Sequence, residues 1–469
     1  MQIIRWVIAP IALGLWPGLC LAADIDGSTL AVWWALPFAG ILLSIAVLPL
    51  LAPAFWHHHF GKITAGWTLV FFIPFAALFG LPLAGTSLVH ALLAEYIPFI
   101  VLLTALYTIA GGIFIRGNLH GSPALNVGLL GIGTFLASVM GTTGASMLMI
   151  RPLIRANNKR IHKTHLVIFF IFLVSNVGGS LTPLGDPPLF LGFLKGVNFF
   201  WTASHILPET LFLTASLLGI FYFLDRWFYR KEGVLPVDST PDIRRIGFDG
   251  AFNFWLLAGV VGLVLLSGFW KGAPVFNVWG TEVSLPALVR DVGLIVLTLV
   301  SIKLTPTQVK QNNQFSWAPM QEVAKLFAGI FLTIIPVIAM LKAGTDGPFG
   351  AIVAAVTRPD GLPDPAMYFW ATGVLSSFLD NAPTYLVFFN TAGGDAKVLM
   401  TTMAPTLAAI SAGAVFMGAN SYIGNAPNMM VKAIAEDRGV KMPSFFGYMA
   451  WSAGILLPLF VVMTFIWFK

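Results

Sequence analysis

Two aspartates stand inside otherwise apolar stretches of the chain, each close to a proline. Asp186 lies in "SNVGGSLTPLGDPPLFLGFLKG" (175–196), and Asp380 lies in "LDNAPT" (379–384). An ionised carboxylate within an apolar span is costly unless it is paired, so such residues usually bind an ion or a substrate. We therefore predict that Asp186 and Asp380 form a cation site, with Na⁺ as the candidate metal.

Each aspartate also has a structural interpretation. Asp186 directly precedes Pro187, so it is well placed to cap the N-terminus of a half-helix, which would still allow contact with an ion. Asp380 could accept a structural hydrogen bond within its own turn. Beside it, Asn381 supplies an amide oxygen suited to a partly dehydrated cation.

Neutral polar side chains accompany the two acids in the sequence. Taken singly, each is more often found hydrogen-bonded to the backbone of an interrupted helix. Taken together, around two acids, they predict a site for a hydrated ion or a small polar solute. The candidates are Asn176, Thr182, Thr142, Thr143, Thr384, Asn420, Ser421 and Asn425, with Ser175 and Asn428 beside them.

The composition is that of a polytopic membrane protein with all-α architecture. Of 469 residues, 57% are hydrophobic and 10% charged, and the mean hydropathy is +0.85. Apolar runs long enough to cross a hydrocarbon core of about 30 Å as helices recur along the whole chain. The net charge of +6 comes from basic clusters that follow the positive-inside rule for cytoplasmic loops, so we expect no nucleic-acid partner.

The N-terminus has the pattern of a secretory signal peptide. Residues 1–23 combine one arginine, an apolar centre and a small-residue exit, which predicts cleavage after Ala22 or Ala23. The alternative is an uncleaved first helix. Cleavage would remove Cys20, the one cysteine of the chain, and would exclude disulfides and cysteine metal sites. The triplet at 57–59 resembles a metal site, but a solvated cytoplasmic loop is the preferred interpretation.

The remaining chain divides into two similar halves. We expect a first transmembrane repeat over 24–226, a cytoplasmic linker over 227–250 and a second repeat over 251–469. Each half contains a re-entrant hairpin, at 123–155 and 367–395, with tips at "GTTG" (141–144) and "LDNAPT". Each also contains a helix broken by glycine and proline, at the 175–196 motif and at "GANSYIGNAPNMM" (418–430).

The matching interruptions predict an inverted-topology repeat, which is the construction of secondary transporters. "ASVMGTTGAS" (137–146) aligns with "SSFLDNAPTY" (376–385), and "NVGGSLTP" (176–183) with "NSYIGNAP" (420–427). We expect a transporter that works by alternating access, not an enzyme. A channel fits the paired breaks less well. An intramembrane aspartyl protease, suggested by "LGD" (184–186), would need its second acid in a Tyr-Asp pair, and Asp380 follows a leucine.

The motif at 175–196 strongly resembles that of the ion transporter superfamily, in which Gly-Gly is followed by Thr-Pro and then Gly-Asp-Pro-Pro. This group includes NhaD-type sodium/proton antiporters, arsenite permeases and putative citrate transporters, and "LDNAP" and "NAPN" look like its second-half counterparts. The resemblance implies a scaffold domain, a transport domain that holds the hairpins and broken helices, a homodimer and elevator-like movement.

The substrate is not fixed by this resemblance. NhaD-type antiporters look to carry Asp-Asn at the first tip, and citrate carriers Ser-Asn-Thr at both, whereas this chain has "GTTG". Two acids without a central Arg or Lys favour Na⁺, Li⁺ or H⁺. We therefore predict Na⁺ (or Li⁺) exchange for H⁺ across a bacterial inner membrane, with cation-coupled symport of citrate or a related organic anion as the alternative. No cofactor is expected, and the expected partners are these ions, the lipid bilayer and a second copy of the chain.

Overall fold

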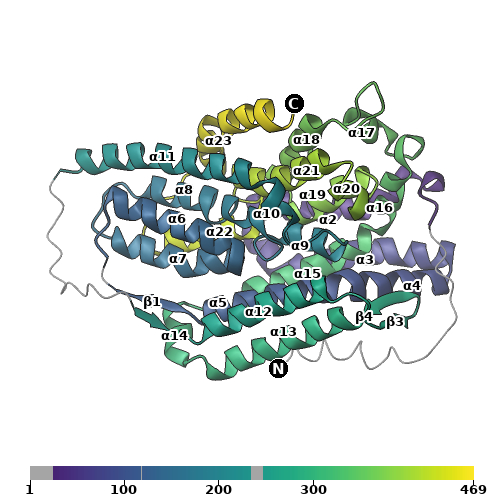
Figure 1. Ribbon diagram of the computed structural model, residues 1–469, viewed down its shortest axis with the longest axis horizontal. Coiled ribbons are helices and arrows are strands. Elements are labelled where there is room, and N and C mark those ends of the chain that lie inside the picture. The colour runs from purple at the N-terminus through teal and green to yellow at the C-terminus, as the bar shows by residue number, and fades with distance from the viewer. Residues whose placement is uncertain (1–24, 118, 234–246) are drawn as a thin grey trace. The chain divides into compact units, whose positions relative to one another are not determined.

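The computed structural model describes residues 25–117, 119–233 and 247–469, and these residues fold almost entirely as helices (Figure 1). Within them, eight helices are long and apolar enough to cross a membrane, or nine if the pair bent by 43° at 334 counts as one span. The chain is thus an all-α polytopic membrane protein, as predicted. The signal-peptide prediction for 1–23 and most of the linker fall outside the described residues.

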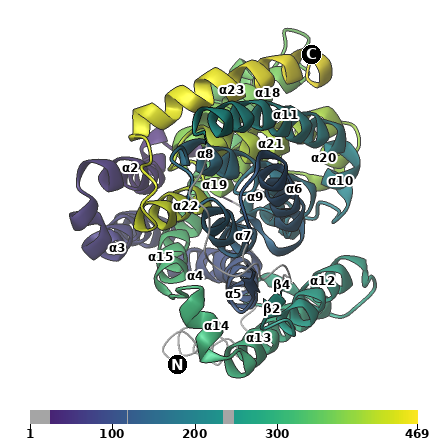
Figure 2. The ribbon, with the colours of Figure 1, turned by 90° about the vertical axis from the view of Figure 1, so that its left-hand side faces the viewer.

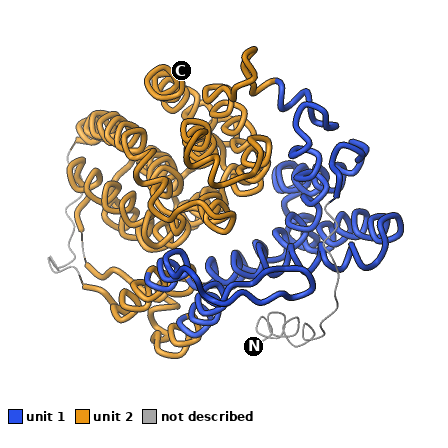
Figure 3. Tube along the Cα trace, turned by 45° about the vertical axis from the view of Figure 1, so that its right-hand side comes forward, with its two compact units in different colours: residues 1–105, 262–297, 316–354 blue, residues 106–261, 298–315, 355–469 orange. Residues whose placement is uncertain are grey.

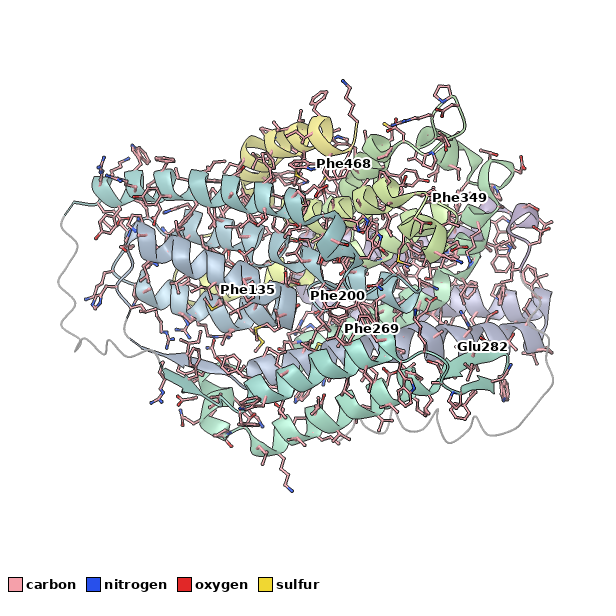
Figure 4. The ribbon with its side chains drawn as sticks, in the orientation of Figure 1. Phe135, Phe200, Phe269, Glu282, Phe349 and Phe468 are labelled. Atoms are coloured by element: carbon pink, nitrogen blue, oxygen red, sulfur yellow. The ribbon has the colours of Figure 1, made fainter. Side chains whose placement is uncertain are left out.

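Large apolar side chains point outward from several helices. Phe135 and Phe269, both marked in Figure 4, are 71% and 53% exposed. Lipid offers no hydrogen-bond partner to a free N–H or C=O group, so a helix in a membrane must hydrogen-bond its own backbone. Such helices expose apolar side chains to the hydrocarbon, as seen here.

The described chain splits into two compact units, coloured separately in Figure 3. Unit 1 takes in the described residues of 1–105, 262–297 and 316–354, and unit 2 those of 106–261, 298–315 and 355–469. Each unit draws on both halves of the chain, so a compact unit is a different division from a sequence repeat. The repeat boundaries given above stay predictions.

Unit 1 packs α3 against α2 and α15, with β3 and β4 forming a short antiparallel pair. Trp56 on α3 donates its indole N–H to Glu322 on α15 at 3.2 Å. Its elements are η1 (Gly27–Thr29), η2 (Val32–Ala35), α2 (Leu36–Leu51), α3 (Pro53–Phe79), α4 (Leu81–His90), the π-helix η3 (Ala91–Tyr96), α5 (Ile97–Gly111), β3 (Val275–Val278), β4 (Thr281–Ser284), α13 (Leu285–Leu304), α15 (Ala318–Thr333), α16 (Ile335–Lys342), η5 (Gly344–Asp346) and α17 (Gly350–Ala355), of which α5 and α13 continue into unit 2.

The loop expected around the histidine triplet is wrong. Helix α3 begins at Pro53, because proline fits the first turn of a helix, and it therefore includes His57, His58 and His59. The imidazole Nδ1 atoms of His58 and His59 lie 2.8 and 3.0 Å from carbonyls one turn back. Among the described residues, no group of three or more His, Cys, Asp or Glu is placed to hold a metal ion.

Unit 2 contains both predicted hairpins and both broken helices. Its elements are β1 (Phe114–Arg116), α6 (Pro123–Met140), α7 (Thr142–Ala156), α8 (Thr164–Leu173), η4 (Val177–Leu181), α9 (Pro187–Leu194), α10 (Trp201–His205), α11 (Leu207–Lys231), β2 (Gly247–Asp249), α12 (Asn253–Phe269), α14 (Thr307–Asn312), α18 (Pro365–Phe378), α19 (Asn381–Thr391), α20 (Ala396–Met400), α21 (Ala404–Met417), η6 (Gly418–Asn420), α22 (Ala426–Asp437) and α23 (Phe445–Trp467), with α12 continuing into unit 1. Strands β1 and β2 pair antiparallel, Ile115 opposite Phe248.

The hairpins α6–α7 and α18–α19 start in the same way. Ser122 caps α6 and Asp364 caps α18, each followed by a proline at the first helical position. The first hairpin turns at Gly141, whose φ of +80° suits a residue without a Cβ. The second turns at Leu379 and Asp380, which are extended and outside the left-handed region.

The broken helices pack against the hairpin of the opposite half. Helix α9 packs on α19, and α22 packs on α7, as Figures 1 and 2 both show. Each half therefore supplies its half-helix to the other half's hairpin. This exchange brings the helix starts at 142, 187, 381 and 426 into one unit.

Candidate ion-binding site

The Asp186 carboxylate is held by side chains from three other elements of unit 2. Thr142 donates its hydroxyl to Oδ1 at 2.9 Å, and Asn425 donates its amide to the same oxygen at 3.2 Å. Asn381 donates to Oδ2 at 2.5 Å. Asp186 is only 1% exposed, so these neutral donors replace the water that the carboxylate would otherwise bind.

Asp186 takes the N-cap position of α9 but does not cap it with its side chain. Its backbone is extended there, and its carboxylate accepts no N–H group of its own helix. The capping interpretation is therefore right for the backbone position and wrong for the side chain, which is directed to Thr142, Asn381 and Asn425 instead.

Asp380 has the opposite arrangement. It caps α19, and its Oδ1 accepts the N–H of Ala382 at 3.1 Å. It is half-buried, and its carboxylate accepts no other hydrogen bond from the described residues. One carboxylate of the predicted pair is thus fully hydrogen-bonded, and the other keeps acceptor capacity.

Two buried amide oxygens lie near these acids in the fold without a partner. Asn381 donates its amide N–H to Asp186, and Asn420 donates its own to Ser377. The Oδ1 atom of each asparagine is buried and accepts no hydrogen bond from the described residues. A buried acceptor without a donor is costly, and amide oxygens are ligands that hard cations prefer. Asn381 follows Asp380 directly, so one helix start offers both a carboxylate and a free amide oxygen.

Further asparagines tie the two breaks together. Asn176 donates to Asn428 Oδ1 at 2.8 Å, and Asn425 donates to Asn176 Oδ1 at 3.3 Å. Asn428 in turn donates to the carbonyls of Gly418 and Ser421, both at 2.9 Å. Asn425 therefore links Asp186 to an amide network that satisfies the interrupted backbone of the second half.

The hydrogen bonds repeat between the halves with a constant shift. In the first half, the Thr182 hydroxyl donates to the Ser138 carbonyl. In the second half, the Ser421 hydroxyl donates to the Ser377 carbonyl, and both of its residues lie 239 positions after their counterparts. The backbone N–H of Leu184 donates to the Thr182 hydroxyl at 3.2 Å, and the backbone N–H of Ile423 donates to the Ser421 hydroxyl at the same distance.

This shift corrects one alignment and keeps the other. The hairpin alignment of 137–146 with 376–385 holds, because its offset is the same. The alignment of 176–183 with 420–427 is wrong, because the hydrogen bonds match Thr182 to Ser421. In the correct register Asp186 corresponds to Asn425, and Gly141 corresponds to Asp380. The equivalent of each acid in the other half is therefore a neutral residue.

The remaining candidates mostly support backbone. The Thr182 and Ser421 hydroxyls donate from the breaks to carbonyls of the hairpin helices α6 and α18. Thr384 on α19 donates to the carbonyl of the N-cap residue Asp380 at 3.0 Å. Asn420 holds the Ser377 hydroxyl at 2.9 Å. Thr143 is half-buried and makes no side-chain hydrogen bond to the described residues.

Sequence reasoning missed a further buried acid that several side chains hold. Asp225 on α11 is fully buried, and its carboxylate accepts from Arg160 Nη2 at 2.8 Å and from Asn126 Nδ2 at 2.9 Å, with His165 Nε2 at 2.8 Å. The available signal was an acid at the end of the expected span 207–226, together with the basic run at 151–163.

The loop that carries Asp186 lies directly on the loop before it, which makes Gly185 a sensitive position. A Cβ at Gly185 would come within 2.2 Å of the Gly179 carbonyl oxygen, which is backbone and cannot rotate away. We expect Gly185→Ala to lower the free energy of unfolding by about 1–3 kcal/mol, as overpacking does. Gly219→Ala is the control, since a Cβ there meets nothing within 4 Å. Thermal melting of the purified variants checks this, and equal melting temperatures would contradict it.

Comparison with known proteins identifies the family of this chain. A protein-family model described as "Putative citrate transport" matches residues 27–468. The chain belongs to this family. The match confirms the resemblance to the ion transporter superfamily and makes the protein a membrane transporter of the citrate transporter family.

Two curated relatives are similarly distant. A "46 kDa membrane protein" of Mycobacterium leprae is 25% identical over 329 residues, which cover 68% of this chain and 71% of the relative. An "Uncharacterized transporter" of Mycobacterium tuberculosis is 24% identical over 333 residues, with the same coverage of 68% and 71%. Membership of the transporter family leaves the transported substrate of this chain to be argued from the site.

Proposed function

We propose that this transporter exchanges Na⁺ or Li⁺ for H⁺, and that Asp380 is the group that binds the two ions alternately. The observation that carries the proposal is the unequal treatment of the two acids. Asp186 has three donors on its carboxylate, whereas Asp380 has one, from its own helix.

Asp186 has the contacts of a fixed anion. Thr142, Asn381 and Asn425 each stand at or beside the start of a helix, where the macrodipole favours negative charge. These helix starts therefore serve the protein's own carboxylate, which reduces their capacity to hold a transported anion. Asp186 then stabilises the arrangement of tips and breaks.

Asp380 has the contacts of an exchanging group. It is half-buried, so ions can reach it, and the neighbouring Asn381 Oδ1 is buried without a donor. A Na⁺ ion would satisfy both oxygens, and a proton would neutralise the carboxylate instead. Because either cation removes the same single charge, binding of one excludes the other, which is the requirement for exchange.

The proposal extends to the setting of the protein. Hairpin tips and broken helices that meet from both halves are the usual site for alternating access. We infer an inner-membrane location, movement of the site-bearing unit as an elevator, and a homodimer as the working form, all from the superfamily resemblance.

Cation-coupled symport of citrate or a related organic anion is the second candidate, and the family match over 27–468 favours it. The helix starts at 142, 187, 381 and 426 would help to offset the negative charge of such a substrate. In that case Asp380 would hold the coupling cation and the anion would bind beside it.

Proteoliposomes loaded with a pH-sensitive dye distinguish the two functions. We expect addition of Na⁺ or Li⁺ alone to move protons, with K⁺ as the comparison cation and empty liposomes as the blank. If no cation moves protons, and labelled citrate accumulates when a Na⁺ or H⁺ gradient is imposed, the exchange proposal is wrong and the symport candidate stands.

Asn381 and Thr142 form a matched pair for testing the cation ligand. Each is the first residue of the second helix of its hairpin, and each donates to Asp186. Asn381 alone has an amide oxygen without a partner among the described residues. We expect Asn381→Leu to raise the KM for Na⁺ about tenfold, which corresponds to about 1.4 kcal/mol for one lost ligand. Thr142→Val removes one donor to Asp186 but no proposed ligand of the cation. The KM for Na⁺ should therefore stay within about twofold of the wild-type value, which corresponds to only about 0.4 kcal/mol. Dye-based flux measured against Na⁺ concentration provides the values, and equal changes in both variants would contradict the assignment.

A further inference from the structure

A cavity in unit 2 has a lining that includes neither Asp186 nor Asp380. It has a volume of about 520 Å³, and it is bounded by the connection between α7 and α8, by Phe228 on α11 and by the connection between α22 and α23. The Thr164 hydroxyl donates to the Lys441 carbonyl at 2.8 Å and so fastens the two connections together. The cavity is therefore built from fixed elements.

The cavity wall is strongly basic. Arg160, Lys163 and Lys441 line it, with His162 and His165, and none of the described residues that line it is acidic. Lys441 is exposed and its ammonium makes no hydrogen bond to the described residues, while Lys163 has a single long contact of 3.5 Å to a carbonyl. Two weakly held ammonium groups thus share one concave surface.

Two acids near this wall are already occupied. Glu232 accepts from Arg160 Nε at 2.6 Å and from the His162 backbone N–H at 2.8 Å. Asp225 accepts from Arg160 Nη2, Asn126 and His165, as described above. These carboxylates hold the guanidinium of Arg160, and neither forms an ion pair with Lys163 or Lys441 among the described residues.

Arg160 retains one uncommitted nitrogen. Its side chain is 1% exposed, and its Nη1 has no hydrogen-bond partner among the described residues. The Tyr229 ring lies 5.0 Å from the guanidinium carbon and holds its plane. One unused guanidinium donor and two ammonium groups thus line the same cavity, and these are groups that bind phosphate.

The surroundings of the cavity are apolar. Ile161 is 72% exposed, and Trp451 on α23 stands at the cavity wall. Tryptophan is typical of membrane interfaces, and basic pockets between membrane helices bind anionic lipid head groups. Apolar and basic side chains that line one cavity suit a molecule with a phosphate head and hydrocarbon chains.

We propose that this cavity binds a phosphate-bearing anion through Arg160, Lys163 and Lys441, and that an anionic membrane phospholipid is its source. The site is separate from the transport site and does not depend on the proposed exchange of cations.

The test uses the full-length protein reconstituted in nanodiscs of phosphatidylcholine, with and without cardiolipin or phosphatidylglycerol. Thermal melting, and native mass spectrometry of retained lipid, report binding. We expect anionic lipid to raise the melting temperature of the wild type. In the double variant Lys163→Gln/Lys441→Gln the affinity for the lipid should fall about 30-fold. This fold-change corresponds to the loss of about 1 kcal/mol of binding free energy for each lysine.

The control variant is Lys271→Gln/Lys303→Gln, which removes the same charge from two exposed lysines outside the cavity. It should behave as the wild type. Inorganic phosphate added to protein in phosphatidylcholine is the second probe. Protection by phosphate and not by lipid would support the anion cavity and overturn the lipid source. No protection by either, or equal loss in both variants, would overturn the proposal as a whole.

Discussion

Asparagine in place of Asp380 is expected to reduce Na⁺-driven proton movement about 100-fold or more, while leaving the protein folded. At an effective dielectric constant of about 20, a unit charge 4 Å from a cation contributes about 4 kcal/mol, so its removal abolishes useful affinity. The amide can still accept the Ala382 N–H that now caps α19, and asparagine caps as well as aspartate does. Initial rates of dye quenching in proteoliposomes measure the loss.

Asp395 provides the matched control for this prediction. It also caps a helix of unit 2, accepting the N–H groups of Lys397 and Val398 at 2.8 and 3.2 Å, and it is exposed. Asp395→Asn should transport at the wild-type rate. Comparable loss in both variants would trace the effect to helix capping, and retention of exchange in Asp380→Asn would remove Asp380 from the ion site.

Asp186→Asn is expected to act on stability as well as on transport. The new amide keeps one acceptor oxygen, and its N–H₂ group takes the place of the other. That group then meets either the Asn381 amide donor or the Thr142 and Asn425 donors, and both sides are left without an acceptor. Leaving buried donors unpaired costs about 1–3 kcal/mol each, so we expect a loss of about 3 kcal/mol or more. Thermal melting of the purified variant in detergent, followed by tryptophan fluorescence, should show a clearly lower midpoint.

Asp249→Asn is the comparison for Asp186. Asp249 binds Arg116 at 2.9 Å, with side-chain exposures of 33% and 62%, and a pair of this kind contributes about 0–1 kcal/mol. Its melting midpoint should stay near that of the wild type. If Asp186→Asn melts together with Asp249→Asn, the three donors do not stabilise a fixed anion, and the division of tasks between the two acids fails.

Local signals in the sequence were enough to predict the main elements of unit 2. Glycine and proline interrupt helices, so the tips at 141 and 380 and the breaks at 175–196 and 418–430 can be placed from neighbouring residues alone. Local signals also misled: the triplet at 57–59 suggested a solvated loop, but it lies in helix α3, which begins at Pro53. A short stretch of sequence does not distinguish proline in a first helical turn from proline in a loop.

The sequence by itself determined a membrane protein with two acids in paired interruptions, because hydropathy and helix breaking depend on neighbouring residues. The tertiary structure decided which acid is satisfied. The bond from Asn381 to Asp186 joins residues 195 positions apart, and the true register of the repeat rests on the matching bonds of Thr182 and Ser421. A carboxylate's partners are set by packing across the two halves, and no short stretch of sequence carries that information.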